Sequence, residues 1–117
     1  MTPVRMQLSR AKGFCLQAAS NALNGLPCVK VDRTTAWGNP FRRGVSGVKT
    51  NKEAVYFFRL ILAGYYPFCA GPELADCTRY RVFTEDHIAD LRGKNLACWC
   101  RPQDACHADV LLELANQ

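Results

Sequence analysis

The segment that constrains the fold most is NLACWC at residues 95–100, which a short polar stretch and CHADVLLELAN follow. It lacks the regular alternation of apolar and polar residues that a strand with one face in water would have. An apolar run of this length is typical of a central strand that is buried on both faces. RPQDA at 101–105 reads as a loop, and Val110, Leu111 and Leu114 then mark the core-facing side of a helix. The C-terminal part is therefore predicted to be a strand, a loop and a helix.

Two segments nearer the N-terminus have the pattern of strands. In VRMQL at 4–8, apolar and polar residues alternate. In CVKVD at 28–32, Val29 and Val31 would lie on one face of the strand. Strands that are separated by helices predict an α/β fold. We therefore expect residues 1–117 to form one small domain, with a central, mainly parallel sheet flanked by helices.

Two helices are predicted between the second strand and the last one. NKEAVYFFRLILAG at 51–64 has apolar residues at the spacing i, i+3, i+4 and i+7, and it ends at a glycine. TEDHIADLRG at 84–93 reads as a short helix that Thr84 caps and that Gly93 terminates. The stretch 64–82 between them contains prolines and glycines. We expect irregular structure there, in the form of an insertion that packs over the first of these helices.

The cysteine content bears on the compartment and the chemistry. The chain has seven cysteines, whereas a secreted disulfide scaffold usually has an even number and an export signal. MTPVRMQLSRAKGF lacks the apolar run of such a signal, and no window reaches 18 apolar residues, so no transmembrane helix is predicted. We expect a cytoplasmic protein whose thiols are buried apolar residues, metal ligands or catalytic groups. The formal net charge of +5 favours an anionic partner, either a nucleotide-like small molecule or a nucleic acid.

The start of the last helix is the first candidate site. Cys106 and His107 would occupy its N-terminus, where unpaired N–H groups and a partial positive charge favour anions. The thiolate of Cys106 would be stabilised there, and His107 would be biased toward its neutral form, which can act as a general base or a metal ligand. Asp109 in the first turn would orient His107 or a ligand hydroxyl. The candidate catalytic residues are therefore Cys106, His107 and Asp109.

A metal site is an alternative for the same region. Cys98 and Cys100 are two apart on a strand and would share a face. Together with Cys106 and His107 they give the spacing C-x-C-x5-C-H, which supplies the Cys3His ligands of a structural zinc site. The common zinc knuckle is C-x2-C, and adjacent residues rarely both reach one ion. Two further alternatives stay open, since Cys98 and Cys100 could be small core residues or reactive thiols.

The second candidate site is DRTTAWGNPFRR at 32–43, which has neither a helical nor a strand period. An aromatic face combined with guanidinium groups is how many proteins hold nucleotides or single strands. The alternative is a structural loop that Trp37 and Phe41 anchor to the core. The candidate ligand-binding residues are Arg33, Trp37, Gly38, Asn39 and Arg42.

Two long segments, VKVDRTTAWGNPF and LRGKNLACWCRPQDACHADVLLELAN, resemble the DUF4326 family of small bacterial and phage proteins. That family is marked by a W-G-N-P-F motif and a C-W-C…C-H-x-D-V-L motif, and VRMQLSRAKGF is similar to its start. The resemblance covers most of the chain apart from 64–82. It implies no reaction, but it implies that the motif residues matter. These are Arg33, Trp37, Asn39, Pro40, Cys98, Cys106, His107 and Asp109.

A local similarity to the DUF488 family is also present. In that family a strand ends in cysteine and the next helix opens with Cys-His-Arg, whereas this chain has Cys106, His107 and Ala108 and so lacks the arginine. The similarity implies a site built from a strand, a loop and a helix rather than a zinc knuckle. It is a likeness of local form and implies no activity.

Three functions are open on this basis. The first is a binding protein or an enzyme that takes a nucleotide, nucleoside or nucleic-acid base into one cleft between the two motif loops. The second is a zinc-stabilised nucleic-acid-binding module, and the third is an accessory factor that binds a host protein. The first requires the W-G-N-P-F loop and the start of the last helix to converge, and it is the one that we favour.

Overall fold

A three-stranded parallel sheet lies at the centre of the computed structural model, which describes residues 2–41, 48–65 and 74–117. In sheet order the strands are β1 (Arg5–Gln7), β3 (Asn95–Cys98) and β2 (Cys28–Lys30). Ala97 of the central strand pairs with Met6 on one side and with Lys30 on the other. The predicted α/β fold with a parallel sheet is confirmed.

The central strand β3 is buried at all four positions, which is why its sequence shows no polar alternation. Ala97 belongs to a small apolar cluster with Leu8 and Cys28. Leu96 and Cys98 point to the opposite face and join the main core. The two clusters lie on the two sides of the sheet, so β3 contributes to both.

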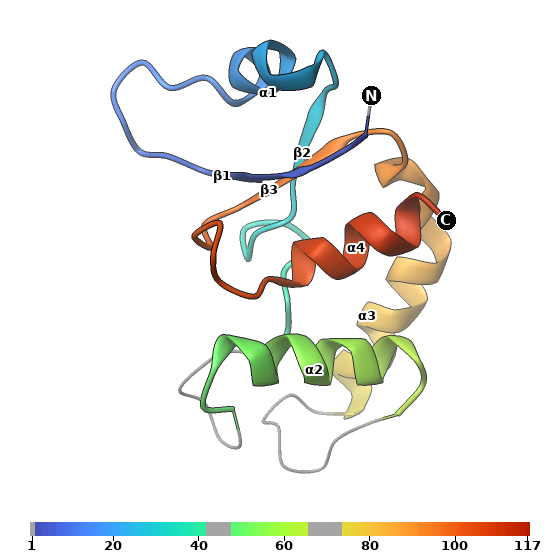
Figure 1. Ribbon diagram of the computed structural model, residues 1–117. Coiled ribbons are helices and arrows are strands. Elements are labelled where there is room, and N and C mark those ends of the chain that lie inside the picture. Colours follow the sequence, from blue (N-terminus) through green and yellow to red (C-terminus); the bar gives the residue numbers. More distant parts are fainter. Residues whose placement is uncertain (1, 42–47, 66–73) are drawn as a thin grey trace.

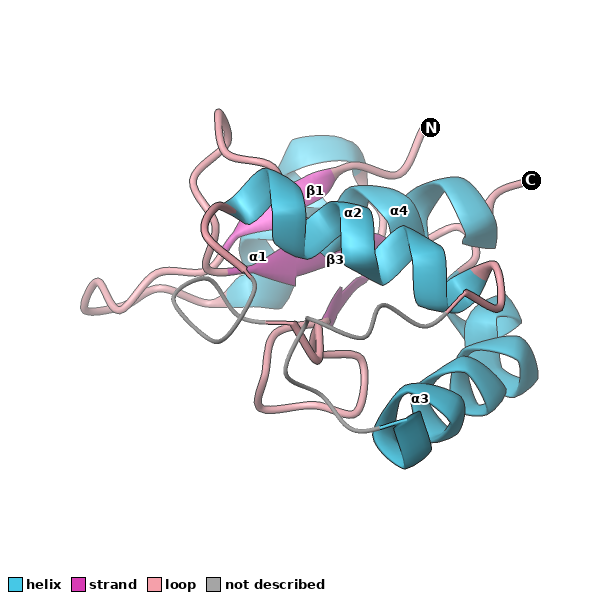
Figure 2. Cartoon of the chain, turned by 90° about the horizontal axis from the view of Figure 1, so that it is seen from below, coloured by secondary structure: helices cyan, strands magenta, loops and turns pink. Residues whose placement is uncertain are grey.

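Helices cover both faces of the sheet. They are α1 (Leu16–Asn24), α2 (Asn51–Leu62), α3 (Leu74–His87) and α4 (His107–Ala115), with a 3-10 turn η1 (Ile88–Leu91) before β3. α1 lies on one face and α4 on the other, and α2 packs on the outer side of α4 (Figure 1). α3 lies to the side of α2 (Figure 2) and leads through η1 to β3. No helix in the described part of the chain is long and apolar enough to cross a membrane.

The helix predicted at 51–64 is present as α2. Its N-cap is Thr50, whose Oγ1 accepts a hydrogen bond from the N–H of Glu53 at 3.1 Å. Ala54, Phe58 and Ile61 are its buried residues, as the helical spacing of apolar residues predicted.

The prediction of irregular structure over 64–82 is wrong from residue 74 onward, and 66–73 lie outside the described residues. α3 runs without interruption to His87, so Thr84 is inside a helix and does not cap one. Its Oγ1 donates to the carbonyl of Tyr80 one turn earlier, at 2.9 Å. The buried side of α3 consists of Cys77, Tyr80 and Thr84, which have helical spacing but mixed polarity. That mixture hides the period from the sequence.

Asn95 joins β3 to α1 through a buried polar network. Its Nδ2 donates to Ser20 Oγ at 2.7 Å and to Asn24 Oδ1 at 2.8 Å, and its Oδ1 accepts from the N–H of Val4 at 3.0 Å. Since every one of these groups has a partner, the amide is tolerated at a fully buried position.

Candidate functional site

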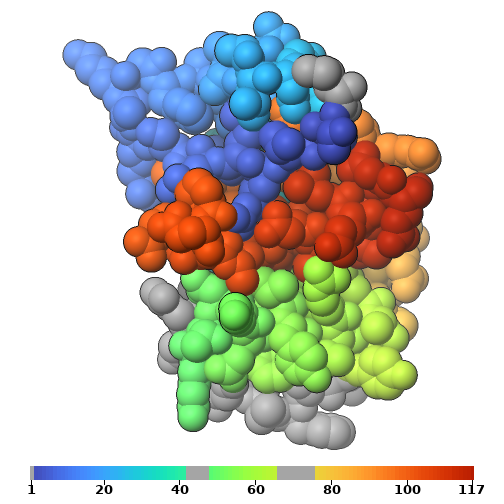
Figure 3. Space-filling view, in the orientation of Figure 1, coloured from blue at the N-terminus to red at the C-terminus, as the bar shows by residue number. Residues whose placement is uncertain are grey.

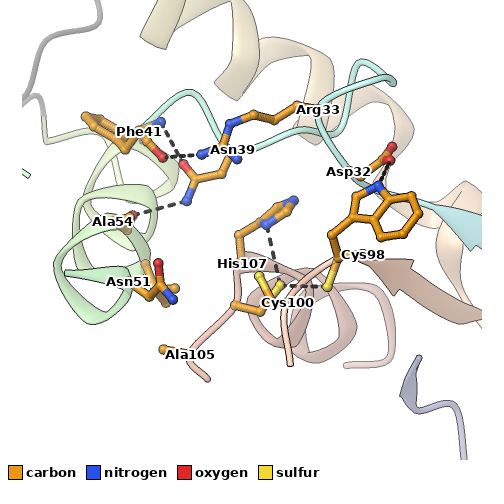
Figure 4. A pocket seen from close by; sticks show the side chains of 13 residues that line it. Asp32, Arg33, Asn39, Phe41, Asn51, Ala54, Cys98, Cys100, Ala105 and His107 are labelled. Carbon is orange, nitrogen blue, oxygen red and sulfur yellow. Dashed lines mark hydrogen bonds between the residues drawn. The ribbon is translucent and has the colours of Figure 1, made fainter. Parts of the chain in front are cut away.

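The two motif loops meet at one cavity beyond the carboxyl ends of β2 and β3. Its volume is about 180 Å³. One wall comes from the loop after β2 and the other from the loop and helix start after β3, with the first turns of α2 between them (Figure 4). The lining residues are Asp32, Arg33, Asn39, Phe41, Asn51, Ala54, Val55, Cys98, Trp99, Cys100, Ala105, Cys106 and His107. A crevice at this edge of a parallel sheet is the usual place for a ligand in α/β folds.

Three thiols, which we call the thiol cluster, form one side of the cavity. Cys98 ends β3, Cys100 lies in the bend that follows and Cys106 is the N-cap of α4. The Sγ atoms of Cys98 and Cys106 are 3.0 Å apart, and all three Sγ atoms lie within 4.8 Å of one another. Cys98 and Cys106 are each 2% exposed, and Cys100 is half-buried. Three sulfur donors at this separation could hold a metal ion.

Hydrogen bonding distributes the protons of the thiol cluster unequally. Bonds from the thiols of Cys100 and Cys98 hold the pKa of Cys106 far below the usual range of a thiol. Bonds to Cys100 and Cys106, together with burial, raise the pKa of Cys98. The bond to Cys106 is also the main cause that raises the pKa of Cys100. The cluster thus favours one thiolate, at Cys106, which the two neighbouring thiols stabilise.

Arg5 is one of the residues at this site that sequence reasoning missed. It reaches from β1 toward α4, where its Nη2 donates to the carbonyl of Pro102 at 2.8 Å and its Nε lies 3.6 Å from Asp109 Oδ1. The thiol of Cys106 lies near enough to raise the pKa of the Arg5 guanidinium, against the opposite effect of burial. Figure 3 shows the loop after β3 lying against the N-terminal strand. The alternation within 4–8 could have placed Arg5 opposite Met6, but it could not have indicated which element lies on that side.

His107 is held by the sheet and not by a carboxylate. Its Nε2 lies 2.7 Å from the carbonyl oxygen of Val31, which can only accept, so Nε2 carries the proton. The ring stands edge-on to Phe58 at 5.4 Å between centroids, and Nδ1 lies 3.8 Å from Cys106 Sγ. Asp109 is exposed and faces Arg5, so the expectation that it orients His107 is corrected.

Trp37 lies in the core, where the alternative of a structural loop had placed it. It is 8% exposed, it packs edge-on against Phe83 at 4.7 Å, and its carbonyl accepts from the Tyr80 hydroxyl at 2.6 Å. Phe41 is fully buried. Because the core covers the Trp37 ring, that ring is not a platform for a base at the cavity.

The other motif residues hold the loop in place at the cavity wall. Asn39 donates from Nδ2 to the carbonyl of Ala54 at 3.3 Å and accepts at Oδ1 from the N–H of Phe41 at 2.9 Å. A Cβ on Gly38 would lie 2.7 Å from the Cα of Arg33, so only glycine allows the two ends of the loop to approach. Arg33 donates to the carbonyl of Phe41 at 2.9 Å and lines the cavity. Arg42 lies outside the described residues.

The sequence did not single out three residues that line the cavity, namely Trp99, Asp32 and Asn51. Trp99 is 40% exposed, and its Nε1 donates to Asp32 Oδ2 at 3.0 Å. The guanidinium carbon of Arg10 lies 4.2 Å from the centroid of the Trp99 ring. Asn51, the first residue of α2, is half-buried at the cavity wall. The only sequence signal for these residues was their position next to the two motifs or at the start of a helix.

Comparison with known proteins identifies the family. The model of a domain of unknown function, DUF4326, matches residues 16–117, which include both motif loops and all three cysteines of the thiol cluster. No curated protein and no solved structure matches the chain. The match extends over most of the sequence, and the chain therefore belongs to the DUF4326 family.

Proposed function

We propose that the cavity between the two motif loops binds the base of a nucleoside or nucleotide and presents the thiol of Cys106 to it. The observation that carries the proposal is the convergence of residues 32–41 and 98–107 on one cavity. A carboxylate, an amide, an indole, a thiol and an imidazole face one small space there. Convergent polar groups in a preformed crevice are the usual mark of a ligand site.

The size of the cavity favours a base over a whole nucleotide. Its volume of about 180 Å³ is below the roughly 300 Å³ at which sites for drug-sized ligands begin. A second hollow of about 210 Å³ shares Arg33 and Asn39 with it and is also lined by Gly38. The sugar and phosphate of a nucleotide would extend toward Arg33 and this hollow. The net charge of +5 favours such an anionic group.

Asn51 and Asp32 are the groups that we propose recognise the base. A side-chain amide can donate to and accept from a base edge at the same time. The amide of Asn51 makes no hydrogen bond to the described residues, so it is available to a ligand. Asp32 is 7% exposed; its Oδ1 accepts from the N–H and the hydroxyl of Thr34, and its Oδ2 accepts only from Trp99 among the described residues, so Oδ2 can accept one more bond at the cavity wall.

Cys106 and His107 are the pair that we propose perform chemistry on the ligand. A thiol beside an imidazole is the arrangement in which a base activates a cysteine nucleophile. Nδ1 of His107 is the unprotonated nitrogen, and it lies 3.8 Å from Cys106 Sγ. Cys106, whose thiolate the cluster favours, is therefore the proposed nucleophile, and His107 is the proposed acid/base beside it.

Ligand binding to an Asn51→Ala variant tests the proposal. Native mass spectrometry of the purified protein would first identify any retained ligand, and calorimetric titration with the four common ribonucleosides would follow. We expect at least one nucleoside to bind, and Asn51→Ala to weaken it by about two- to tenfold, the equivalent of one hydrogen bond. Asn21→Ala, on the exposed side of α1, is the matched control. The proposal fails if no nucleoside binds or if the two variants bind equally well.

The thiol cluster supports a second candidate, a zinc site. A tetrahedral ion with Zn–S bonds of about 2.3 Å has sulfur atoms about 3.8 Å apart. The three sulfur atoms all lie within 4.8 Å of one another, and the 3.0 Å separation of Cys98 and Cys106 would have to widen to hold the ion. Three thiolates around Zn²⁺ carry a net charge of −1, which Arg5 beside Cys106 would offset. Nδ1 of His107 or a ligand would complete the coordination, and the bound ion would supply Lewis acidity.

Elemental analysis of protein purified without added metal decides the second candidate. One zinc ion per chain is expected, and Cys98→Ser should lose it. Cys28→Ser, which changes a buried thiol on the other side of the sheet, should retain it. The zinc candidate is eliminated if the wild-type protein carries no stoichiometric metal, or if both variants retain equal amounts. A zinc-bound form would keep nucleic acid as a proposed partner because of the net charge.

A further inference from the structure

We propose that the thiol cluster reduces small hydroperoxides, with Cys98 and Cys106 closing to a disulfide. These two sulfurs are 3.0 Å apart, although the residues come from different elements, the end of β3 and the N-cap of α4. A disulfide requires about 2.05 Å. The sulfurs therefore need to approach by only about 1 Å, which a change of side-chain torsions can supply.

The surroundings of the two thiols select a small oxidant. Both are 2% exposed, and both form part of the wall of a cavity of about 180 Å³. A hydroperoxide enters such a space, whereas a tripeptide disulfide is too large for it. The guanidinium of Arg5, which the carbonyl of Pro102 holds at 2.8 Å, adds positive charge near the Cys106 sulfur.

The chemistry balances with a hydroperoxide as the oxidant. The Cys106 sulfur attacks one peroxide oxygen and the O–O bond breaks. The leaving oxygen takes a proton and departs as an alcohol, or as water from hydrogen peroxide. Cys106 is now a sulfenic acid. The Cys98 sulfur then attacks the Cys106 sulfur and the S–O bond breaks. The hydroxyl group of the sulfenic acid takes the Cys98 proton and leaves as water. Two thiols have lost two electrons in total and one hydroperoxide has gained them.

Cys100 does not take part in the proposed disulfide. Its sulfur lies within 4.8 Å of the other two, but it is half-buried, whereas Cys98 and Cys106 are both buried and in direct contact at 3.0 Å. It should remain a thiol when Cys98 and Cys106 are joined. A dithiol reductant would return the disulfide to two thiols.

Peptide mapping after a single oxidation tests the proposal. Reduced, desalted protein with a chelator present would receive one equivalent of hydrogen peroxide, followed by iodoacetamide and trypsin. All three cysteines fall in the peptide 95–117, because trypsin does not cleave between Arg101 and Pro102. We expect this peptide to lose about 2 Da and to carry one alkyl group, on Cys100.

Variants of the cysteines identify which thiols react. Cys100→Ser should form the same disulfide, and the double variant Cys98→Ser/Cys100→Ser should stop at a Cys106 sulfenic acid that dimedone traps. Exposed Cys15 is the internal control for unselective oxidation. The proposal is overturned if all three thiols remain alkylatable, if the free thiol is Cys98 or Cys106, or if Cys15 is oxidised as fast as the pair. No ligand takes part, so this outcome is independent of the proposed nucleobase site.

Discussion

Replacing His107 tests its structural role, which is to donate a hydrogen bond and to fill space in the core. The imidazole is 5% exposed, donates from Nε2 to the Val31 carbonyl at 2.7 Å and packs edge-on against Phe58. His107→Phe keeps most of the ring volume but removes the donor. His107→Ala removes both the donor and the ring.

The expected magnitudes follow from these contacts. His107→Phe leaves a buried carbonyl without its donor, which costs about 1–3 kcal/mol. His107→Ala adds the cavity left by an aromatic-sized side chain, so its total should be about 3–5 kcal/mol. Both values are large beside the total of about 5–15 kcal/mol that stabilises a typical domain.

Urea denaturation followed by circular dichroism measures both free energies of unfolding. His87→Ala is the matched control, because His87 is exposed and its contacts are Asp90 one turn away and the half-buried ring of Phe83, and surface changes of this kind usually stay within about 0.5 kcal/mol. The reasoning is refuted if His107→Phe is as stable as the wild type, because the Val31 bond would then contribute nothing. It is also refuted if His87→Ala costs as much as His107→Ala.

Three further outcomes are expected. Gly38→Ala should destabilise the chain by about 1–3 kcal/mol, because its Cβ would meet backbone at 2.7 Å; a melt that matches the wild type would contradict this. Asn95→Ala should cost at least about 2 kcal/mol in the same assay, since Ser20, Asn24 and the N–H of Val4 each lose a hydrogen bond to its amide, while Asn21→Ala should be near neutral. Burial raises the pKa of the Tyr80 phenol, so its contribution is complete below the unfolded pKa of about 10 and is lost as pH rises above it. Tyr80→Phe should therefore flatten the loss of stability between about pH 9 and pH 11, and an unchanged slope would disprove this.

The elements that the sequence predicted correctly are those whose burial pattern is regular. The apolar run that begins at Leu96 reflects a strand covered on both faces. The spacing of Ala54, Phe58 and Ile61 reflects one buried helix face. The first part of α3 was not predicted as a helix, because its buried face mixes Cys77, Tyr80 and a polar threonine. Packing rather than periodicity specifies this helix.

The candidate site divides in the same way. The start of the last helix placed Cys106 and His107 together because local sequence determines a helix N-terminus. The approach of Arg5 to Cys106 depends on strand order, which short local patterns do not encode. Trp37 illustrates a different limit, since an aromatic residue in a loop has the same composition whether it packs in the core or stacks on a ligand.

The most direct test of the proposed nucleobase site is a titration of ¹⁵N-labelled protein with ribonucleosides, followed by NMR at the two indole N–H groups and at the Asn51 amide. Trp99 lines the cavity and Trp37 lies in the core. Binding in the cavity should move the Trp99 and Asn51 signals and leave the Trp37 signal in place. Saturating nucleoside that moves none of the three, or that moves Trp37 alone, would contradict the account.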